Sequence, residues 1–428
     1  MLSRAYAALG RVAAFPHFAS LRSYRDFRNI WLTGMFSFGG MWSFIVAASW
    51  IAHERSEGSA WVGIITFSSL IPFLVISPIG GLLADRVERR TLVWVSTIVN
   101  TLVAVGVAIA ALAGSLELWH LAAAAFVGGG SRSAMEPGIQ ALIPNQVPQR
   151  HILNAITLNG LTHHGSRFFG LLVAAPLLAV GGIGPEGVLV LSAVLTGVAI
   201  IFAARCRTIS RGERTPSSGV LSGMIEGLVY VYTHKTIAIF ILLVAFHCAL
   251  VMSFESIMPV FSAQSLGATD GSYLGYLIMG FGLGSAIGIL IVAGVQSERM
   301  KGQLLFWTGV TSGLTPIVLA VSGHIVPATL FAGLMGATQA TFMAISNAFV
   351  LMVAPDRLRG RISSLYVLHA GGIMAFANLG YGFLADQYSA WAIFIVTGVI
   401  FVAVVIGMSG SQPMLRRVYR TGQLAAPA

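Results

Sequence analysis

Long apolar segments alternate with short basic breaks along almost the whole of this sequence, and this alternation constrains the fold more than any other feature. An α-helix needs roughly 20 mostly apolar residues to cross the hydrocarbon core of a bilayer, at about 1.5 Å of rise per residue. Segments of this kind occupy residues 28–51, 60–84, 91–113, 118–142, 152–181, 186–205, 237–262, 272–296, 303–322, 325–349, 361–386 and 389–410. The sequence therefore predicts an all-α membrane protein with twelve transmembrane helices.

The scarcity of charged residues excludes a soluble fold. Only 9% of the 428 residues are charged, 56% are hydrophobic, and the mean hydropathy is +0.83. A soluble domain carries about 25% charged residues, which form the shell that faces water. This chain has too few to build such a shell, so we expect lipid to cover most of its exterior.

The basic residues predict the orientation of the helices. Cytoplasmic loops of membrane proteins carry an excess of Lys and Arg. With the N-terminus placed in the cytoplasm, only Arg55 of the 25 Lys and Arg residues falls on the outer side, while Arg132 and Arg167 fall within helices. We therefore expect both termini to be cytoplasmic in a multi-pass protein of a bacterial inner membrane. Basic loops of this kind do not form the single basic face of a nucleic-acid-binding protein.

The longest polar break divides the chain into two halves of six helices. The predicted organisation is a cytoplasmic or interfacial N-terminal segment (1–26), a first half (27–205), a cytoplasmic central loop (206–236), a second half (237–410) and a cytoplasmic tail (411–428). Weak internal symmetry supports this division, because Pro148-Gln-Arg150 opens the fifth helix and Pro355-Asp-Arg357 opens the eleventh. Two parallel six-helix repeats with a substrate held between them are a transporter architecture.

A conspicuous motif stands between the second and third predicted helices. The run Gly81-Leu-Leu-Ala-Asp85-Arg86-Val-Glu88-Arg89-Arg90 resembles the G-x-L-A-D-R-x-G-R-R motif of the major facilitator superfamily, with Glu88 where the motif has glycine. A glycine permits close helix contact, and the arginines keep the loop in the cytoplasm. The resemblance implies a cytoplasmic conformational latch that is formed by Gly81, Asp85 and Arg89.

Three further segments are similar to the enterobactin-exporter and macrolide-efflux branch of this superfamily. They are residues 27–32, residues 148–159 and residues 355–366, and the resemblance covers roughly residues 24–410. It implies proton-driven export of a small molecule. The chain departs from proton-driven drug antiporters at Gly170-Leu171, where those proteins usually have Gly-Pro. The direction of transport therefore rests on the resemblance to the branch.

Polar and ionisable residues inside the predicted helices are the candidate functional residues. An ionisable group at the bilayer centre costs at least about 2.5 kcal/mol and usually faces the interior of the helix bundle. The candidates for proton coupling or substrate binding are Arg132, Glu136, Asn159, His163, Arg167, His247 and Glu255. Arg132 and Glu136 are one turn apart and are expected to pair, unless Glu136 changes partners as the inward cavity opens.

Glu255 is the predicted proton-coupling carboxylate, because its own helix offers it no basic neighbour. The alternative is a hydrated carboxylate at the outer mouth. Arg167 is interpreted either as a structural cation between the halves or as the partner of a substrate anion or a proton-carrying carboxylate. His247 is expected to be a hydrogen-bonded core residue, and Asp386 a solvated helix end. Tyr366, His369 and Asn378 are expected to line a cavity or an interface.

The leading hypothesis is a monomeric secondary active exporter of a small molecule, amphiphilic compounds included, that works by alternating access with protons as the coupling ion. The alternatives are an importer or facilitator of a small metabolite, and a non-transporting sensor or lipid-handling protein. The sequence has no phosphate-binding loop, and His163 and His164 point to different sides of a helix. We therefore expect no enzymatic activity, no ATP, no metal and no cofactor.

Overall fold

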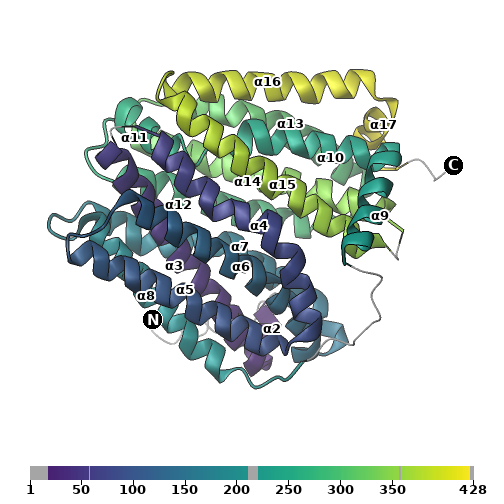
Figure 1. Cartoon of the computed structure of the whole chain (residues 1–428). Coiled ribbons are helices and arrows are strands. Elements are labelled where there is room, and N and C mark those ends of the chain that lie inside the picture. The colour runs from purple at the N-terminus through teal and green to yellow at the C-terminus, as the bar shows by residue number, and fades with distance from the viewer. Residues whose placement is uncertain (1–17, 57, 211–219, 356–357, 425–428) are drawn as a thin grey trace, which may run out of the picture.

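The structure is a computed structural model, and it describes residues 18–56, 58–210, 220–355 and 358–424. Every regular element in these ranges is helical, and Figure 1 shows them as two packed bundles. The first half contains α2 (Ala19–Ser23), α3 (Arg25–Ser56), α4 (Ala60–Arg86), α5 (Arg89–Leu112), α6 (Leu118–Gln146), η2 (Gln149–His151), α7 (Ile152–Leu178) and α8 (Gly184–Arg205).

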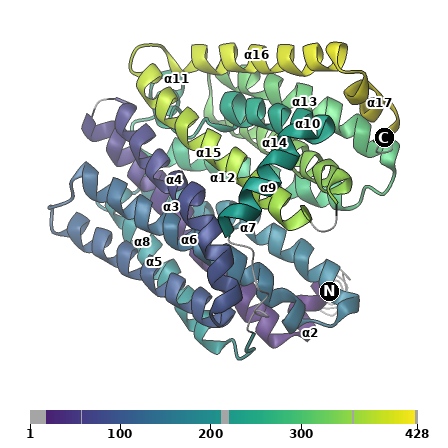
Figure 2. The same cartoon turned by 45° about the vertical axis from the view of Figure 1, so that its right-hand side comes forward.

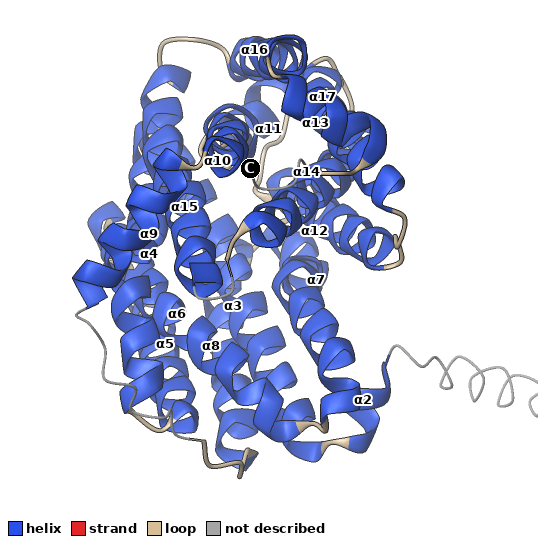
Figure 3. Ribbon diagram, turned by 90° about the vertical axis from the view of Figure 1, so that its right-hand side faces the viewer, coloured by secondary structure: helices blue, strands red, loops and turns tan. Residues whose placement is uncertain are grey.

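The predicted central loop contains the helix α9 (Val220–Thr233). The second half contains α10 (Lys235–His247), η3 (Cys248–Met252), α11 (Met258–Leu266), α12 (Ser272–Ala293), α13 (Glu298–Ala320), α14 (Ile325–Val353), α15 (Arg359–Ala385) and α16 (Ala390–Ser411), and α17 (Pro413–Thr421) follows in the C-terminal tail. Figure 3 shows the two halves one above the other, from the side that carries α9 and α17.

All twelve apolar ranges fall on helices, which confirms the all-α fold. Within the described residues, nine helices are long and apolar enough to cross a membrane. The number that does cross, and the side on which the termini lie, stay predictions. The prediction of one continuous helix over 237–262 is wrong, because α10 passes into the π-helical turn η3 and an irregular stretch precedes α11.

Side chains from two other helices stabilise this break. A backbone group inside a bilayer needs a partner within the protein, because lipid offers none. Gln339 on α14 donates to the carbonyl of Val251 at 2.8 Å, and Tyr381 on α15 donates to that of Ala249 at 2.7 Å. The Asn378 carboxamide oxygen accepts from the backbone N–H of Ser256 at 3.2 Å. The break is therefore an anchored part of the second half.

Glycines set the contact between α12 and α14. A methyl group on Gly280 would lie 2.6 Å from the Thr329 carbonyl oxygen, and one on Gly288 would lie 2.5 Å from that of Ala337. Gly284 faces Gly333 in between. Only hydrogen fits at these positions, so the two backbones approach closely.

The two halves touch through α4 with α15 and through α7 with α12. A methyl group on Gly63 would lie 3.1 Å from Gly382 Cα, and one on Gly275 would lie 2.6 Å from Ala175 Cβ. We call the end of the molecule at which these contacts gather the sealed end. Towards the opposite end, which carries α2 and α9, the ribbons of the halves diverge (Figure 2).

Candidate functional site

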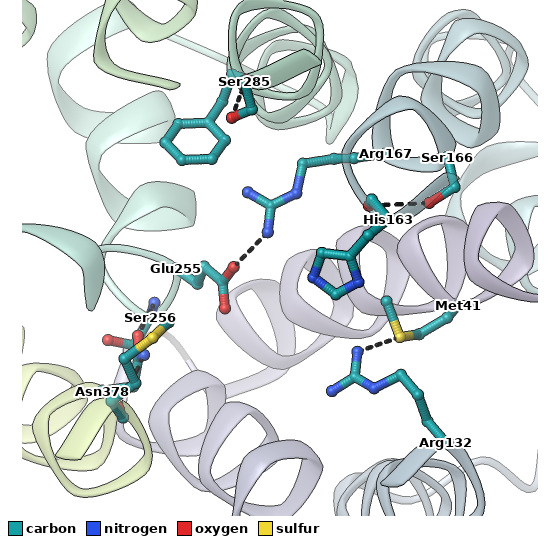
Figure 4. Close-up of polar contacts among 11 residues, drawn as sticks. Met41, Arg132, His163, Ser166, Arg167, Glu255, Ser256, Ser285 and Asn378 are labelled. Carbon is teal, nitrogen blue, oxygen red and sulfur yellow. Dashed lines mark hydrogen bonds and ion pairs between the residues drawn. The ribbon is translucent and has the colours of Figure 1, made fainter. Parts of the chain in front are cut away.

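A buried ion pair joins the two halves. Arg167 lies on α7 in the first half, and Glu255 lies in the break between η3 and α11 in the second half. Arg167 Nη2 donates to Glu255 Oε1 at 3.0 Å, and their side chains are only 14% and 9% exposed. Figure 4 shows the two side chains pointing toward each other across the interface. The alternative of a hydrated Glu255 at the outer mouth is therefore wrong in this structure.

Aromatic rings from both halves enclose the Arg167 guanidinium. Its central carbon lies 3.5 Å from the Trp42 ring centroid and 4.7 Å from that of Phe281. Cation–π contacts contribute about 0.5–2 kcal/mol each, more when they are desolvated. Gly282 on α12 lets the Arg167 side chain pass, because a methyl group there would lie 2.9 Å from Arg167 Cβ. The surroundings thus position the guanidinium tightly.

The predicted pairing of Arg132 with Glu136 is not formed. The Glu136 carboxylate turns toward α7, where its Oε1 lies 3.6 Å from His163 Nδ1, too far for a hydrogen bond. The Arg132 guanidinium lies 4.6 Å from the Phe73 ring centroid and donates from Nη1 to Met41 Sδ. The guanidinium of Arg132 is thus in direct contact with Phe73 and Met41 and not with the Glu136 carboxylate.

Two other candidates lie apart from the ion pair. Asn159 is half-buried on α7, two turns before Arg167. His247 at the end of α10 is fully buried between Phe342 and Phe401, with ring centroids 4.5 and 5.1 Å away. Among the described residues neither ring nitrogen of His247 has a hydrogen-bond partner, so the expectation of a hydrogen-bonded histidine is wrong.

The predicted latch is only partly visible. The side chains of Gly81 and Asp85 lie outside the described residues. Arg89 Nη1 donates to the Ala141 carbonyl oxygen at 3.1 Å and to Ser210 Oγ at 2.9 Å, which ties α5 to α6 and to the start of the central loop. The latch itself stays a prediction.

A second polar contact between the halves involves Asp386, which has no functional signal in the sequence. Its side chain is exposed, as predicted, but its carboxylate accepts from the backbone N–H groups of Ser59 and, at 3.2 Å, of Ala60. These groups open α4, where the helix dipole favours a negative charge. Asp386 follows α15, so this contact connects the halves at the sealed end.

A cavity lies between α4, η3 and α15. Its volume is about 590 Å³, and its lining is apolar except for His369. The lining residues are Leu74, Ala249, Leu368, His369, Gly372, Ile373, Phe376 and Ala377. The predicted lining role is confirmed for His369, whereas Tyr366 is buried inside the second half and donates to the Met343 carbonyl at 3.0 Å.

In the parts of the chain that the structure describes, no three His, Cys, Asp or Glu side chains converge as metal ligands.

Two helical halves meet at a buried ion pair beside a broken helix. This is the architecture of a membrane transporter that is built from two structural repeats. The sequence matches the family described as transmembrane secretion effector over residues 16–418, and the chain belongs to this family of the major facilitator superfamily. This confirms the resemblance that the motif of residues 81–90 indicates.

Individual relatives agree with this assignment. The multidrug efflux pump Tap of Mycolicibacterium fortuitum is 22% identical over 327 residues, which cover 74% of this chain and 79% of that protein. Macrolide efflux protein A of Enterococcus faecalis is 22% identical over 329 residues, which cover 75% of this chain and 98% of that protein. The crystal structure of a D-xylose–proton symporter superposes with a TM-score of 0.72 over 94% of this chain and 100% of that chain, at 14% identity, which shows a shared fold.

Proposed function

We propose that this protein is a secondary active exporter of small amphiphilic molecules, driven by protons, with Glu255 as the coupling carboxylate. The buried Arg167–Glu255 ion pair carries the proposal, because it links the halves that move against each other in alternating access. The efflux pumps among the relatives support export as the direction.

Protonation of Glu255 changes the balance between conformations. Removing one partner of a buried ion pair costs about 3–5 kcal/mol, because the other charge is left without compensation. A proton on Glu255 would leave Arg167 in that position, so the ionised and protonated forms favour different arrangements of the halves. With the predicted topology the sealed end is the outer one, and the structure is then the inward-facing conformation.

The cavity beside η3 is the proposed substrate contact. Its volume of about 590 Å³ falls within the roughly 300–1,000 Å³ that is typical of small-molecule pockets. Its apolar lining suits an amphiphilic compound. His369 provides one polar group, whose orientation is fixed because its Nε2 lies 2.8 Å from the Tyr232 hydroxyl and its Nδ1 lies 2.7 Å from the Leu365 carbonyl oxygen.

The variant Glu255→Gln tests the coupling role. In proteoliposomes with an imposed pH gradient and a panel of compounds that includes macrolides, we expect wild-type protein to accumulate substrate against its gradient. Glu255→Gln should lose this accumulation and retain substrate exchange, because exchange needs no net proton movement. The control is Glu54→Gln, which alters an exposed carboxylate. Accumulation retained in Glu255→Gln would reject Glu255 and make Glu136 the next candidate.

The same assay separates export from its alternatives. The Gly170-Leu171 pair, where antiporters usually have Gly-Pro, is the observation that favours an importer or facilitator. Protons and substrate that move in the same direction would identify an importer. Substrate flux without any response to the pH gradient would identify a facilitator, and no flux of any compound would support a non-transporting protein.

A further inference from the structure

Arg132 is a buried guanidinium that forms no ion pair with any carboxylate of the described residues. The residue is 7% exposed, and no carboxylate oxygen of a described residue lies within 4.0 Å of its nitrogen atoms. Its Nε has no hydrogen-bond partner in the described chain. Arg167, by contrast, has Glu255 at 3.0 Å. A buried charge without a directly contacting counter-charge is unfavourable, so the surroundings of Arg132 require a further explanation.

A small cavity adjoins Arg132 inside the first half. It lies between α3, α5, α6 and α8 and has a volume of about 50 Å³. Ser37 and Asn100 line it together with Arg132. Ser37 is 3% exposed, and its hydroxyl has no partner among the described residues. Two buried polar groups without partners thus border the same space.

The other hydroxyl groups of the wall are already satisfied. Ser192 Oγ donates to the Gly40 carbonyl at 2.7 Å, and Thr196 Oγ1 donates to the Ser192 carbonyl at 2.9 Å. The unused hydrogen-bonding capacity is therefore confined to Arg132, Ser37 and the Asn100 amide, which can present its NH₂ group. All three can act as donors toward one occupant.

The size of the cavity limits that occupant. Roughly 10–15 Å³ suffices for one water molecule, whereas pockets for drug-sized ligands measure about 300–1,000 Å³. A volume of about 50 Å³ admits a small ion with part of its hydration shell and excludes the transported molecule. Water alone would satisfy the donors, whereas an anion would also place a negative charge in direct contact with the guanidinium, which no described carboxylate does.

We propose that this cavity binds a small anion of halide size, held by Arg132 Nε and the Ser37 hydroxyl with the Asn100 amide beside it. A small carboxylate such as formate has the same chemistry. The site is separate from the Arg167–Glu255 pair, and its existence does not depend on which compound the protein transports.

Thermal unfolding of the purified full-length protein in detergent tests the proposal. The midpoint is followed as sodium gluconate is replaced by sodium chloride at constant ionic strength, with sodium formate in a parallel series. A bound anion stabilises the folded state in a saturable way. We expect the wild-type midpoint to rise to a plateau, and the rise to be absent in Arg132→Gln. Loss of a hydrogen bond to a charged group should weaken half-saturation by roughly tenfold or more in Ser37→Ala.

The control is Ser133→Ala, which removes a buried hydroxyl that donates to the Gly130 carbonyl at 2.8 Å within α6 and does not line the cavity. It should keep the wild-type anion response. A response to formate without one to chloride would identify a carboxylate as the ligand. A midpoint that is insensitive to both anions, or an unchanged half-saturation in Ser37→Ala, would overturn the proposal even if Arg132→Gln failed to fold.

Discussion

At the scale of single residues, Arg167 is the most constrained side chain of the site. Trp42 and Phe281 cover it, Glu255 neutralises it, and Gly282 leaves room for its stem. These neighbours come from both halves. The energy of the contacts around Arg167 therefore depends on how the halves are arranged.

Gly282→Ala should disfavour the sealed arrangement. The new methyl group would lie 2.9 Å from Arg167 Cβ and Cγ and from the Phe168 backbone nitrogen, closer than side chains pack. Overpacking of this kind costs about 1–3 kcal/mol. We expect a longer distance between spin labels at Val180→Cys and Thr269→Cys, which lie on exposed loops of the two halves.

The control for this variant is Gly106→Ala, because no atom lies within 4 Å of the added methyl group. It should leave the distance distribution unchanged. If the distance distribution of Gly282→Ala were also unchanged, the clash of the new methyl group with Arg167 would not disfavour the sealed arrangement, and the prediction would be wrong.

The chemical type of the candidate residues could be predicted from the sequence, but their partners could not. Arg167 and Glu255 each stand out as ionisable groups in apolar segments, yet they are 88 positions apart. Spacing rules relate residues only within a turn or so of one helix. The same limit explains the wrong prediction that Glu136 pairs with Arg132. In the structure the Glu136 carboxylate lies near His163 on another helix.

At the scale of elements, the break between α10 and α11 is the feature that hydropathy misses. The residues of 237–262 are mostly apolar, and composition alone predicts an unbroken helix. The break depends on Gln339, Tyr381 and Asn378, which belong to helices about a hundred positions further along the chain. The small-residue face of α12 could be predicted, because Gly280, Gly284 and Gly288 recur at every fourth position of one helix.

Asp386→Asn should weaken the closure of the sealed end. A carboxylate at a helix N-terminus contributes about 0.3–1 kcal/mol when it is exposed. We therefore expect a roughly two- to fivefold smaller ratio of sealed to unsealed molecules, measured with the same pair of spin labels. Asp270→Asn is the matched control, because Asp270 accepts from the Ser272 backbone N–H at 2.8 Å within one half. Equal effects of both variants would contradict an interdomain role for Asp386.

Asp85→Asn should act in the opposite direction. Gly63 lies near Gly382, and Gly372 lies near Leu74, so α4 and α15 run antiparallel and Asp85 belongs to the end of α4 away from the seal. If Asp85 stabilises the closed cytoplasmic end, losing its charge raises the sealed population and slows transport. The measurements are the spin-label distance and the transport rate of the folded variant. Wild-type values of both would refute the latch.

At the scale of the whole molecule, the division into two halves could be predicted from the central basic loop. The sequence could not predict which end of the halves is closed, because that depends on contacts such as Gly275 with Ala175 that leave no local pattern.

The topology has a direct test. Position 213 should be cytoplasmic, and position 268 should face the outside.

Labelling with a membrane-impermeant maleimide should modify Ala268→Cys in intact cells and Glu213→Cys only after permeabilisation. The native background should be low, because Cys206 and Cys248 are free but 1% and 0% exposed. Burial also raises the pKa of the Cys206 thiol to about 11, so little reactive thiolate exists at neutral pH. Labelling of position 213 from outside would reverse the orientation.

The Arg167–Glu255 pair also has a consequence for bioenergetics. With Glu255 ionised the pair has no net charge, so the membrane potential does no work on it as the halves rock. With Glu255 protonated, one positive charge remains on Arg167, and a unit charge that crosses 100 mV exchanges about 2.3 kcal/mol with the field. In the proposed cycle only the step in which Glu255 is protonated would then depend on the membrane potential. A potential that is negative inside the cell would favour movement of this positive charge toward the cytoplasm.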